Sequence, residues 1–180
     1  MKDVERKLIA ELMRDSRRSD RELARAVGVS QPTISRAIAK LKKDGVIREF
    51  TVIPDYEKLG YHLVAFTLVK NRTGITKEEL ENAREASLRD MKRAPANIVL
   101  FERGLGDGYT AILISFHEDY SDYTQLKDRM KQYPFLDTSS TLSFILDLND
   151  KIHYRYLTFS TLASDLLQKA REKTNRDEQE

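Results

Sequence analysis

The stretch that decides the fold is residues 19–45, SDRELARAVGVSQPTISRAIAKLKKDG. Ser19 and Glu22 have the spacing of a capping box, in which each side chain satisfies a backbone N–H at the start of a helix. A short helix is therefore expected after Ser19, and Gly28 is placed to end it in the left-handed conformation. The apolar residues that this helix is expected to bury are Leu23, Ala24 and Val27.

A second helix is expected directly after this turn. Ser30 is predicted to cap it, and Pro32 is tolerated because backbone N–H groups in a first turn have no acceptor within the helix. Gly45 closes the helix, and no acidic residue occurs between Ser30 and Asp44. The inward stripe of this helix is predicted to be Ile34, Ile38 and Leu41.

The segments on either side complete a small domain. The stretch DVERKLIAELMRDSRR from residue 3 places apolar residues on one helical face, and polar residues at 14–20 then break this pattern. Residues 46–53, VIREFTVI, have the β-branched and aromatic composition of a strand or wing. Pro54 ends that strand. Three helices followed by a wing form a winged helix-turn-helix, which we expect to occupy residues 1–60 with its linker. The apolar face of the first helix is Val4, Leu8, Ile9, Leu12 and Met13.

The helix after Ser30 has the side chains of a DNA-reading helix. In a helix-turn-helix the N-terminal residues of this helix meet base edges, where Arg pairs with guanine, Gln with adenine, and Ser or Thr with either. Lysines farther along, Lys42 among them, are expected to contact phosphates and supply affinity. Arg48 and Arg17 or Arg18 are weaker phosphate candidates. The predicted DNA-binding residues are Ser30, Gln31, Thr33, Ser35, Arg36, Lys40 and Lys43.

The second half of the chain has the order strand, helix, strand, strand, helix, strand. This order predicts a ferredoxin-like α+β domain over residues 61–150, with an antiparallel sheet and both helices on one face. The other face then needs a cover, and a second copy of the chain is the simplest one, which predicts a dimer. The predicted elements are residues 62–70, 76–91, 97–103, 109–116, 119–132 and 139–148, with a tight turn at 104–108.

A last helix is predicted at residues 158–173, within a C-terminal segment 151–180. Its apolar residues recur with helical spacing, and its polar face carries both signs of charge, so it is expected to pack on its own subunit or on a partner subunit rather than on a membrane. It can also fill a ligand cleft, cap an oligomer or bind another protein. The apolar stripe is Phe159, Leu162, Ala163, Leu166, Leu167 and Ala170.

Composition narrows the class of protein. The 180 residues are 33% charged and contain no cysteine, so neither a disulfide framework nor a thiolate metal site can form. The sequence shows no long apolar run and no signal peptide, which favours the cytoplasm. Residues 1–60 hold 14 Lys and Arg against 10 Asp and Glu, and the totals of 31 and 29 leave 17 against 19 for the remainder. The front of the chain is thus the basic part, although such a bias also arises by chance.

The run over residues 3–61 resembles the DNA-binding half of the Lrp/AsnC (feast/famine) transcriptional regulators. The shared signature is ELA…VGVS…ISR…L…GVI, and the second half is similar to the effector-sensing domain of that family, with its G-x-x-D turn at Gly104, Leu105, Gly106 and Asp107. The resemblance implies a dimer formed through the second domains, often assembled into tetramers or octamers. It also implies a small effector, commonly an amino acid, bound near this turn at a subunit interface.

By position, the resemblance makes Gly104, Gly106 and Asp107 effector-binding residues, with Thr138 or Ser140 at the start of the last strand. Glycine lets a backbone approach a ligand closely, and the carboxylate of Asp107 can hold an ammonium group. The alternative is a plain hairpin turn, since Gly and Asp are ordinary turn residues.

Catalysis finds little support in the sequence. His62, His117 and His153 are far apart along the chain, and no metal-binding motif, nucleotide loop or cysteine nucleophile occurs, so we expect no enzyme and no cofactor. One alternative is a tetrapyrrole enzyme similar to the sirohaem decarboxylases, which use the same two-domain architecture. Another is an adaptor that binds proteins through the 158–173 helix. The retained Gln31 and Arg36 favour the regulator.

Overall fold

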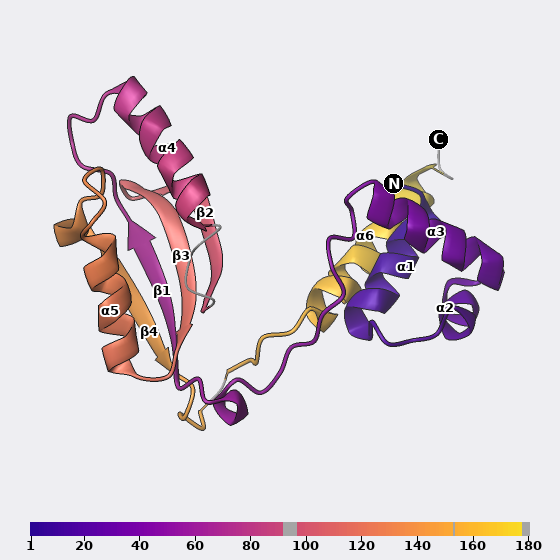
Figure 1. The fold of residues 1–180 in the computed structure, drawn as a ribbon. Helices are drawn as coiled ribbons and strands as arrows, with labels where there is room; N and C mark the ends of the chain where they lie inside the picture. The colour runs from indigo at the N-terminus through magenta and orange to yellow at the C-terminus, as the bar shows by residue number, and fades with distance from the viewer. Residues whose placement is uncertain (92–96, 153, 178–180) are drawn as a thin grey trace. The chain divides into compact units, whose positions relative to one another are not determined.

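The computed structural model describes residues 1–91, 97–152 and 154–177, without the side chains of residues 87, 88, 90, 91 and 170–177. The chain forms two compact units, one of residues Met1–Ile53 with Tyr154–Glu180 and one of Pro54–His153 (Figure 1). The C-terminal segment, which we predicted as a separate part, therefore belongs to the unit that contains the N-terminus. The first unit also ends at Ile53, before the expected boundary at residue 60.

The first unit has four helices in the described residues. The residues predicted to point inward form its core, and Leu8, Ile34 and Leu41 among them are at most 1% exposed. The capping box of Ser19 and Glu22 is formed, as predicted from their spacing. The helices are α1 (Asp3–Arg14), α2 (Asp20–Val27), α3 (Gln31–Lys43) and α6 (Ser160–Asp177).

The turn between α2 and α3 begins at Gly28, which has the predicted left-handed conformation with φ of 81°. Ser30 occupies the cap position of α3, but its hydroxyl does not cap the helix, so that prediction was wrong. The Ser30 hydroxyl instead shares a hydrogen bond of 2.8 Å with the hydroxyl of Thr33, and the Thr33 N–H donates to the backbone oxygen of Ser30.

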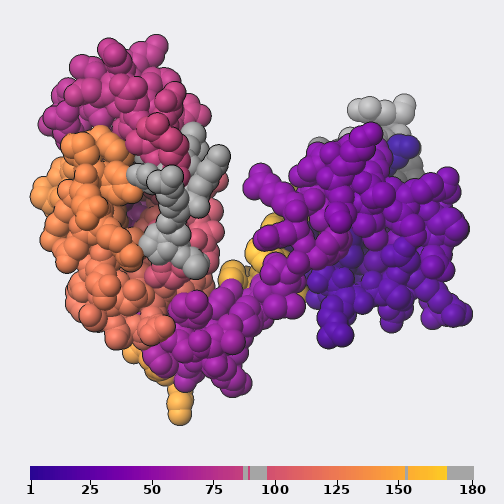
Figure 2. Space-filling view, viewed as in Figure 1, coloured from indigo at the N-terminus to yellow at the C-terminus, as the bar shows by residue number. Residues whose placement is uncertain are grey.

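Residues 46–53 form no strand, which corrects the prediction of a regular wing. A strand needs a neighbouring backbone to exchange hydrogen bonds, and this segment pairs with no strand of the described chain. The N–H groups of Val46 and Ile47 bond to the oxygen of Leu41, and the segment then continues at the molecular surface (Figure 2). Phe50 is 46% exposed and Val52 is 71% exposed.

The predicted C-terminal helix exists, and it packs along α1 of the same chain. Ala163 on α6 is completely buried, and a guanidinium nitrogen of Arg14 lies 3.5 Å from the hydroxyl of Ser164. Of the predicted apolar stripe, Phe159 and Leu162 remain 47% and 53% exposed. The helix therefore uses only part of its apolar surface against α1.

The second unit is the predicted ferredoxin-like domain. Its strands follow the order β2-β3-β1-β4 with antiparallel neighbours, and Figure 1 shows α4 and α5 on one side of the sheet. The elements are β1 (Leu63–Val69), α4 (Lys77–Met91), β2 (Ile98–Gly106), β3 (Tyr109–His117), α5 (Tyr120–Met130) and β4 (Leu142–Asp147), with short 3₁₀ helices η1 (Glu57–Leu59) and η2 (Thr138–Ser140).

Two boundaries of this domain differ from the prediction. Strand β2 continues to Gly106, and only Asp107 and Gly108 form the turn to β3, both with positive φ (51° and 80°). Such a two-residue turn matches the twist of the strands that it joins, so the expected five-residue turn was wrong. The start of the expected last strand lies in η2, because the carboxylate of Asp137 accepts the N–H groups of Ser139 and Ser140.

The sheet has one covered and one open face. On the helix side, Leu126 and Met130 of α5 pack against Val69, Ala111 and Leu113 of the strands. On the other side, β4 presents an apolar row next to the similar row of β1, since residues directly opposite in antiparallel strands share a face. The exposed residues of this row are Leu142 (53%), Phe144 (68%) and Leu146 (40%).

Candidate nucleic-acid interface

Helix α3 separates its residues cleanly into a buried and an outer face. Ile34 and Leu41 are buried in the core, as predicted. Every predicted DNA-binding residue lies on the outer part of this helix or at its N-terminal cap, and all but the half-buried Thr33 are exposed. The structure thus brings the seven predicted residues onto one continuous surface, with Gln31 and Arg36 in its N-terminal half.

Hydrogen bonds along the helix position two of these side chains. The Nε of Arg36 donates to the backbone oxygen of Pro32 at 3.1 Å, so the side chain lies back along α3. Its two terminal nitrogens make no hydrogen bond to the part of the chain that the structure describes. The hydroxyl of Ser35 donates to the backbone oxygen of Gln31 at 3.3 Å and to the carboxylate of Asp20. A guanidinium group held by its Nε keeps the paired nitrogens that recognise guanine.

The fold brings two acidic residues to α3 that the local sequence did not predict. Asp20, the first residue of α2, contacts Ser35, and Glu5 of α1 accepts a hydrogen bond of 2.7 Å from the ammonium group of Lys40. Asp44 lies 3.5 Å from the same ammonium group. A signal for Glu5 was present, because this acid sits three residues before Leu8 on the buried stripe of α1.

Lys40 therefore joins α3 to α1 in addition to its predicted contact with phosphate. The hydrogen bond from Lys40 is the main cause that lowers the pKa of Glu5, and the same contact raises the pKa of Lys40. The side chain of Lys40 is still 57% exposed. Within the described residues Lys43 makes no ion pair, and Lys42 lies 5.8 Å from the ring centre of Phe50.

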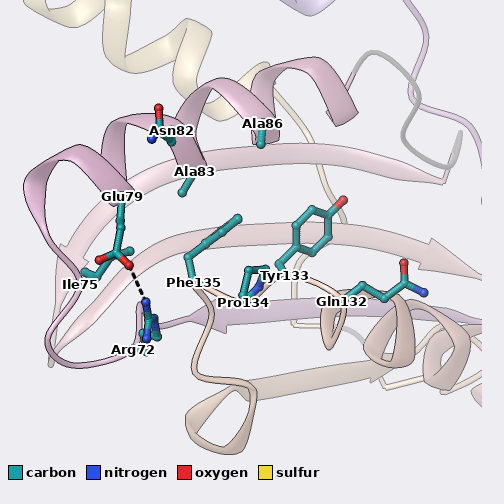
Figure 3. A pocket seen from close by; sticks show the side chains of 10 residues that line it. All are labelled: Arg72, Ile75, Glu79, Asn82, Ala83, Ala86, Gln132, Tyr133, Pro134 and Phe135. Carbon is teal, nitrogen blue, oxygen red and sulfur yellow. Dashed lines mark hydrogen bonds and ion pairs between the residues drawn. The ribbon is translucent and has the colours of Figure 1, made fainter.

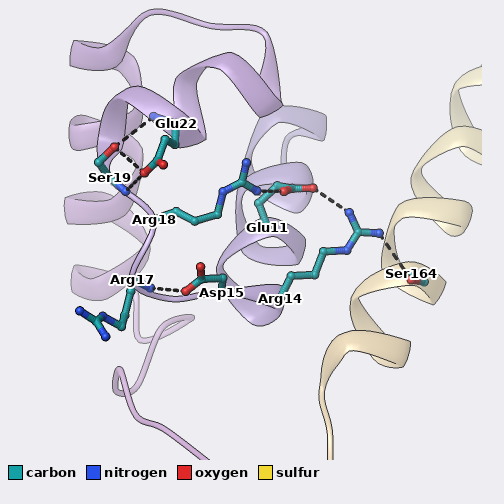
Figure 4. Close-up of polar contacts among 8 residues, drawn as sticks. All are labelled: Glu11, Arg14, Asp15, Arg17, Arg18, Ser19, Glu22 and Ser164. Atoms are coloured by element: carbon teal, nitrogen blue, oxygen red, sulfur yellow. Dashed lines mark hydrogen bonds and ion pairs between the residues drawn. The ribbon is translucent and has the colours of Figure 1, made fainter.

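The arginines before α2 also differ in whether their guanidinium groups pair with an acid of the same chain. Arg14 and Arg18 both pair with the carboxylate of Glu11, as Figure 4 shows. The backbone N–H of Arg17 bonds to Asp15 at 2.9 Å, while its guanidinium group points away from this cluster. Of Arg17 and Arg18, Arg17 is therefore the better placed to contact phosphate.

The predicted effector residues do not form one pocket in a single chain. Gly104, Gly106 and Asp107 lie on the β2–β3 hairpin, whereas Ser140 lies in η2 beside β4. Both sites are at the same end of the sheet, but β3 and β1 lie between β2 and β4, so the glycines of β2 are about 14 Å from β4 at the usual strand spacing.

The glycines of the β2–β3 hairpin differ in whether the backbone conformation requires them. Asp107 and Gly108 have the positive φ that this turn requires, which accounts for both residues structurally. Gly104 and Gly106 have no positive φ, and an added Cβ would meet nothing within 4 Å at either position. The backbone of the chain therefore does not itself require these two glycines. Leu105 between them is 99% exposed.

A separate groove of about 520 Å³ lies between α4 and the segment that follows α5. Figure 3 shows Ala83 and Ala86 of α4 facing Phe135 across it, with the ion pair of Arg72 and Glu79 at one end. The sequence did not predict this groove. Glu79 also accepts the backbone N–H of Thr76 at the start of α4. The charged groups at this end of the groove therefore already have partners within the chain.

One cluster has the composition of a catalytic triad. The ring of His117 hydrogen-bonds Ser115 and Asp122, both at 2.8 Å. Ser115 and His117 are completely buried, so no substrate reaches the Ser115 hydroxyl. The cluster joins β3 to α5, in agreement with a packing role for this histidine. The described residues hold no group of three or more possible metal ligands, and none of their helices is long and apolar enough to span a membrane.

Comparison with known proteins supports a DNA-binding helix-turn-helix in this part of the chain. Residues 1–48 match the family described as winged helix-turn-helix DNA-binding. The HTH-type transcriptional regulator FL11 of Pyrococcus horikoshii is 39% identical over 80 residues, which are 44% of this chain and 53% of that protein. The chain spans about half the length of the curated relatives that it matches.

Solved structures share the fold over a longer part of the chain. An AsnC family transcriptional regulator from Agrobacterium tumefaciens has a TM-score of 0.67 at 24% identity, over 90% of this chain and 99% of that one. A transcriptional regulator from Neisseria meningitidis, solved as a complex with L-methionine, has a TM-score of 0.67 at 19% identity over the same shares.

The class that follows is a protein with an N-terminal DNA-binding helix-turn-helix segment and a ferredoxin-like α+β domain. More particularly, the fold is that of solved regulators of the Lrp and AsnC type, in agreement with the resemblance seen in the sequence.

Proposed function

We propose that this protein is a dimeric, sequence-specific DNA-binding transcriptional regulator whose affinity for DNA responds to a small effector such as an amino acid. The observation that carries the proposal is the outer face of α3, where Gln31, Ser35 and Arg36 are exposed on a helix whose other side is the core. The regulators that match the N-terminal segment support it.

Gln31 and Arg36 are the proposed base-reading residues, with Ser30, Thr33 and Ser35 beside them. Lys40 and Lys43 contact phosphates, as Lys42 does. Base contacts give sequence preference, whereas phosphate contacts give affinity that falls with salt. Larger assemblies such as tetramers or octamers are compatible with this arrangement.

Dimerisation uses the open face of the sheet. Phe144 and its neighbours on β4 expose a row of large apolar side chains, which would cost free energy if it stayed in water. A second copy presents the same row, so a two-fold axis brings two self-complementary faces together. Two reading helices then meet two half-sites on one face of DNA.

The effector binds at the β2–β3 hairpin, where a second copy supplies the remaining contacts. Gly104 and Gly106 are glycines that the chain's own backbone does not require, so their lack of side chains serves a close approach from outside. Asp107 holds the ammonium group of an amino acid, and Ser140 serves the site of a neighbouring copy. The Neisseria regulator that was solved with L-methionine supports an amino acid as the ligand class.

We further propose a cytoplasmic protein without catalytic activity and without a cofactor. A regulator meets DNA in the cytoplasm, and the buried Ser115 and His117 of the cluster with Asp122 offer no surface for a reaction.

Selection from a random duplex library at moderate salt tests the function. We expect enrichment of a palindrome whose half-sites lie one or two helical turns apart. The matched control is a double variant, Gln31→Ala with Arg36→Ala, which is expected to keep weak, salt-sensitive binding without enrichment. The enriched duplex then serves as a probe for single amino acids, beginning with L-methionine.

Absence of any enriched sequence for the unaltered protein would contradict sequence-specific binding. Equal enrichment by the double variant would show instead that α3 is not the reading helix. An affinity that no amino acid changes would contradict the effector assignment alone.

A further inference from the structure

The chain passes between its two units twice. Residues 46–62 lead from α3 to the sheet, and residues 148–159 lead from β4 back to α6. Because α6 belongs to the unit of α1, α2 and α3, that unit is tied to the sheet at both of its ends.

Both connections leave the sheet at the same place. The N–H of Leu148, just after β4, donates to the backbone oxygen of His62, just before β1, at 2.8 Å. The ring of His62 also bonds to the side chain of Asn149 at 2.9 Å. These bonds hold the two connections side by side where they enter and leave the sheet.

The first connection has little free length. On the helical side, the hydroxyl of Ser16 donates to the backbone oxygen of Thr51 at 3.4 Å. On the sheet side, the ring of Tyr56 lies 4.3 Å from that of Phe116. Only residues 52–55 lie between these anchors, and Pro54 stiffens them further.

The second connection depends on the packing of α6. No residue of α1 from Val4 to Met13 is exposed, because α2 and α3 cover one side of that helix and α6 covers the other. Ala163 is fully buried in this contact. The outer face of α3 stays exposed, so α6 does not compete with DNA for that helix.

We propose that α6 is a second anchor that limits how the DNA-reading unit turns relative to the sheet, and so narrows the range of half-site spacings that the protein accepts. The inference rests on the proposed function for its DNA readout. A body held by one connection can still turn about it, whereas a second connection attached at another point of the same body, here through α6, removes much of this freedom. In a dimer, the reach of each reading unit determines which second half-site it finds.

Lengthening the second connection tests the proposal without touching the packing of α6. The variant carries ten Gly and Ser residues inserted between Asp150 and Lys151, a flexible chain with an end-to-end distance of about 17 Å. The control carries the same ten residues after Glu180. Each protein is titrated with duplexes in which two selected half-sites are moved apart one base pair at a time, over one helical turn.

The unaltered protein and the control are expected to bind the best spacing at least about tenfold more tightly than a spacing half a turn away. The insertion is expected to reduce this ratio to about threefold or less, with the same affinity for a duplex that holds a single half-site. An unchanged ratio in the insertion variant would overturn the proposal.

A second pair of variants removes the anchor itself. Ala163→Glu places a charge in the contact of α6 with α1, and Thr161→Glu adds the same charge at an exposed position of α6. Only Ala163→Glu is expected to relax the spacing preference. Equal preferences in both variants would count against the anchor, and the insertion variant decides the matter where Ala163→Glu fails to fold.

Small-angle X-ray scattering without DNA tests the second anchor separately from the proposed DNA-binding function. The insertion variant is expected to show a broader distribution of interatomic distances than the control with the C-terminal addition. Identical distributions would overturn the second anchor whatever DNA the protein binds. Absence of any selected DNA would contradict the proposed function, while the scattering still decides whether the second connection restricts the reading unit.

Discussion

The carboxylate of Glu5 on α1 accepts a hydrogen bond of 2.7 Å from the ammonium group of Lys40 on α3. The side chain of Glu5 is only 9% exposed, and it also accepts the backbone N–H of Lys2 at 2.8 Å. This pair fixes the C-terminal half of the reading helix against the first helix. Glu5 therefore helps to hold α3 in place, although its negative charge repels the phosphates of DNA.

The contact with Lys40 makes the stability of this unit depend on pH. Because the pKa of Glu5 is lowered in the folded state, its contribution is present above the ordinary Glu pKa and is lost as the pH falls through the lower folded value. We expect the free energy of unfolding to fall more for the unaltered protein than for Glu5→Gln between about pH 5 and pH 3. Urea unfolding followed by circular dichroism measures this difference. Equal losses would contradict the assignment, and Glu78→Gln on α4 is the control.

Arg36 and Lys43 are expected to differ in what they contribute to DNA binding. Arg36→Ala should cost about 1–3 kcal/mol on the selected duplex and relax the preference at one base pair. Lys43→Ala should weaken all duplexes alike and reduce the slope of log affinity against log salt by about one. Fluorescence anisotropy at several salt concentrations measures both. Lys131→Ala in the sheet unit is the control, and the same loss pattern for both variants would refute the roles.

Asp20 places a negative charge beside the reading helix through its contact with Ser35. Asp20→Asn keeps an acceptor for the hydroxyl and removes the charge. We expect tighter binding to any duplex at low salt, with a difference that shrinks as salt screens the charge. Asp128→Asn on α5 controls for the change in net charge. Unchanged affinity at low salt would place Asp20 away from the bound DNA.

Phe144 tests the open face of the sheet. Phe144→Glu is expected to give a particle of the monomer mass, 20.9 kDa, where the unaltered protein gives at least twice that mass. Sedimentation equilibrium measures the mass. Tyr120→Glu on α5 is the control, because Tyr120 is 62% exposed and Phe144 is 68% exposed. A dimer that survives Phe144→Glu would mean that another surface joins the copies.

The glycines of the hairpin separate folding from binding. Gly106→Ala is expected to leave stability unchanged or slightly raised, since the added Cβ meets nothing within 4 Å, but to abolish the response to the effector. Gly108→Ala is the contrasting variant. It should lose at least about 1 kcal/mol of stability, because its φ is +80° and the Cβ would lie 3.1 Å from the Lys70 ammonium nitrogen. A normal response in Gly106→Ala would remove this residue from the effector site.

Local chemistry explains the parts of the fold that the sequence predicted well. The box of Ser19 and Glu22, the stop at Gly28 and the buried stripe of α3 depend on residues within one or two turns of each other. The outer face of α3 was predictable for the same reason, because helical spacing alone decides which side chains point away from Ile34 and Leu41.

The parts that failed depend on neighbours from distant sequence. Residues 46–53 have the composition of a strand, but a strand forms only where another backbone is available. The hairpin was predicted too long because Gly104 and Gly106 suggest a turn, although only Asp107 and Gly108 have the conformation of one. The sequence between residues 30 and 43 does not predict the contacts of α3 with Asp20 and Glu5, because these acids lie on other helices.

Local sequence was enough to predict the helix-turn-helix, the order of elements in the second domain and the residues available for reading DNA, because helical and strand periodicity are local properties. Tertiary structure alone decided that α6 returns to pack on α1, that Glu5 holds Lys40, and that Ser140 lies two strands from the hairpin. These relationships join residues that are far apart in the chain. Packing and charge pairing select such contacts from many possible ones, and the pattern of residues within one segment does not predict which contacts form.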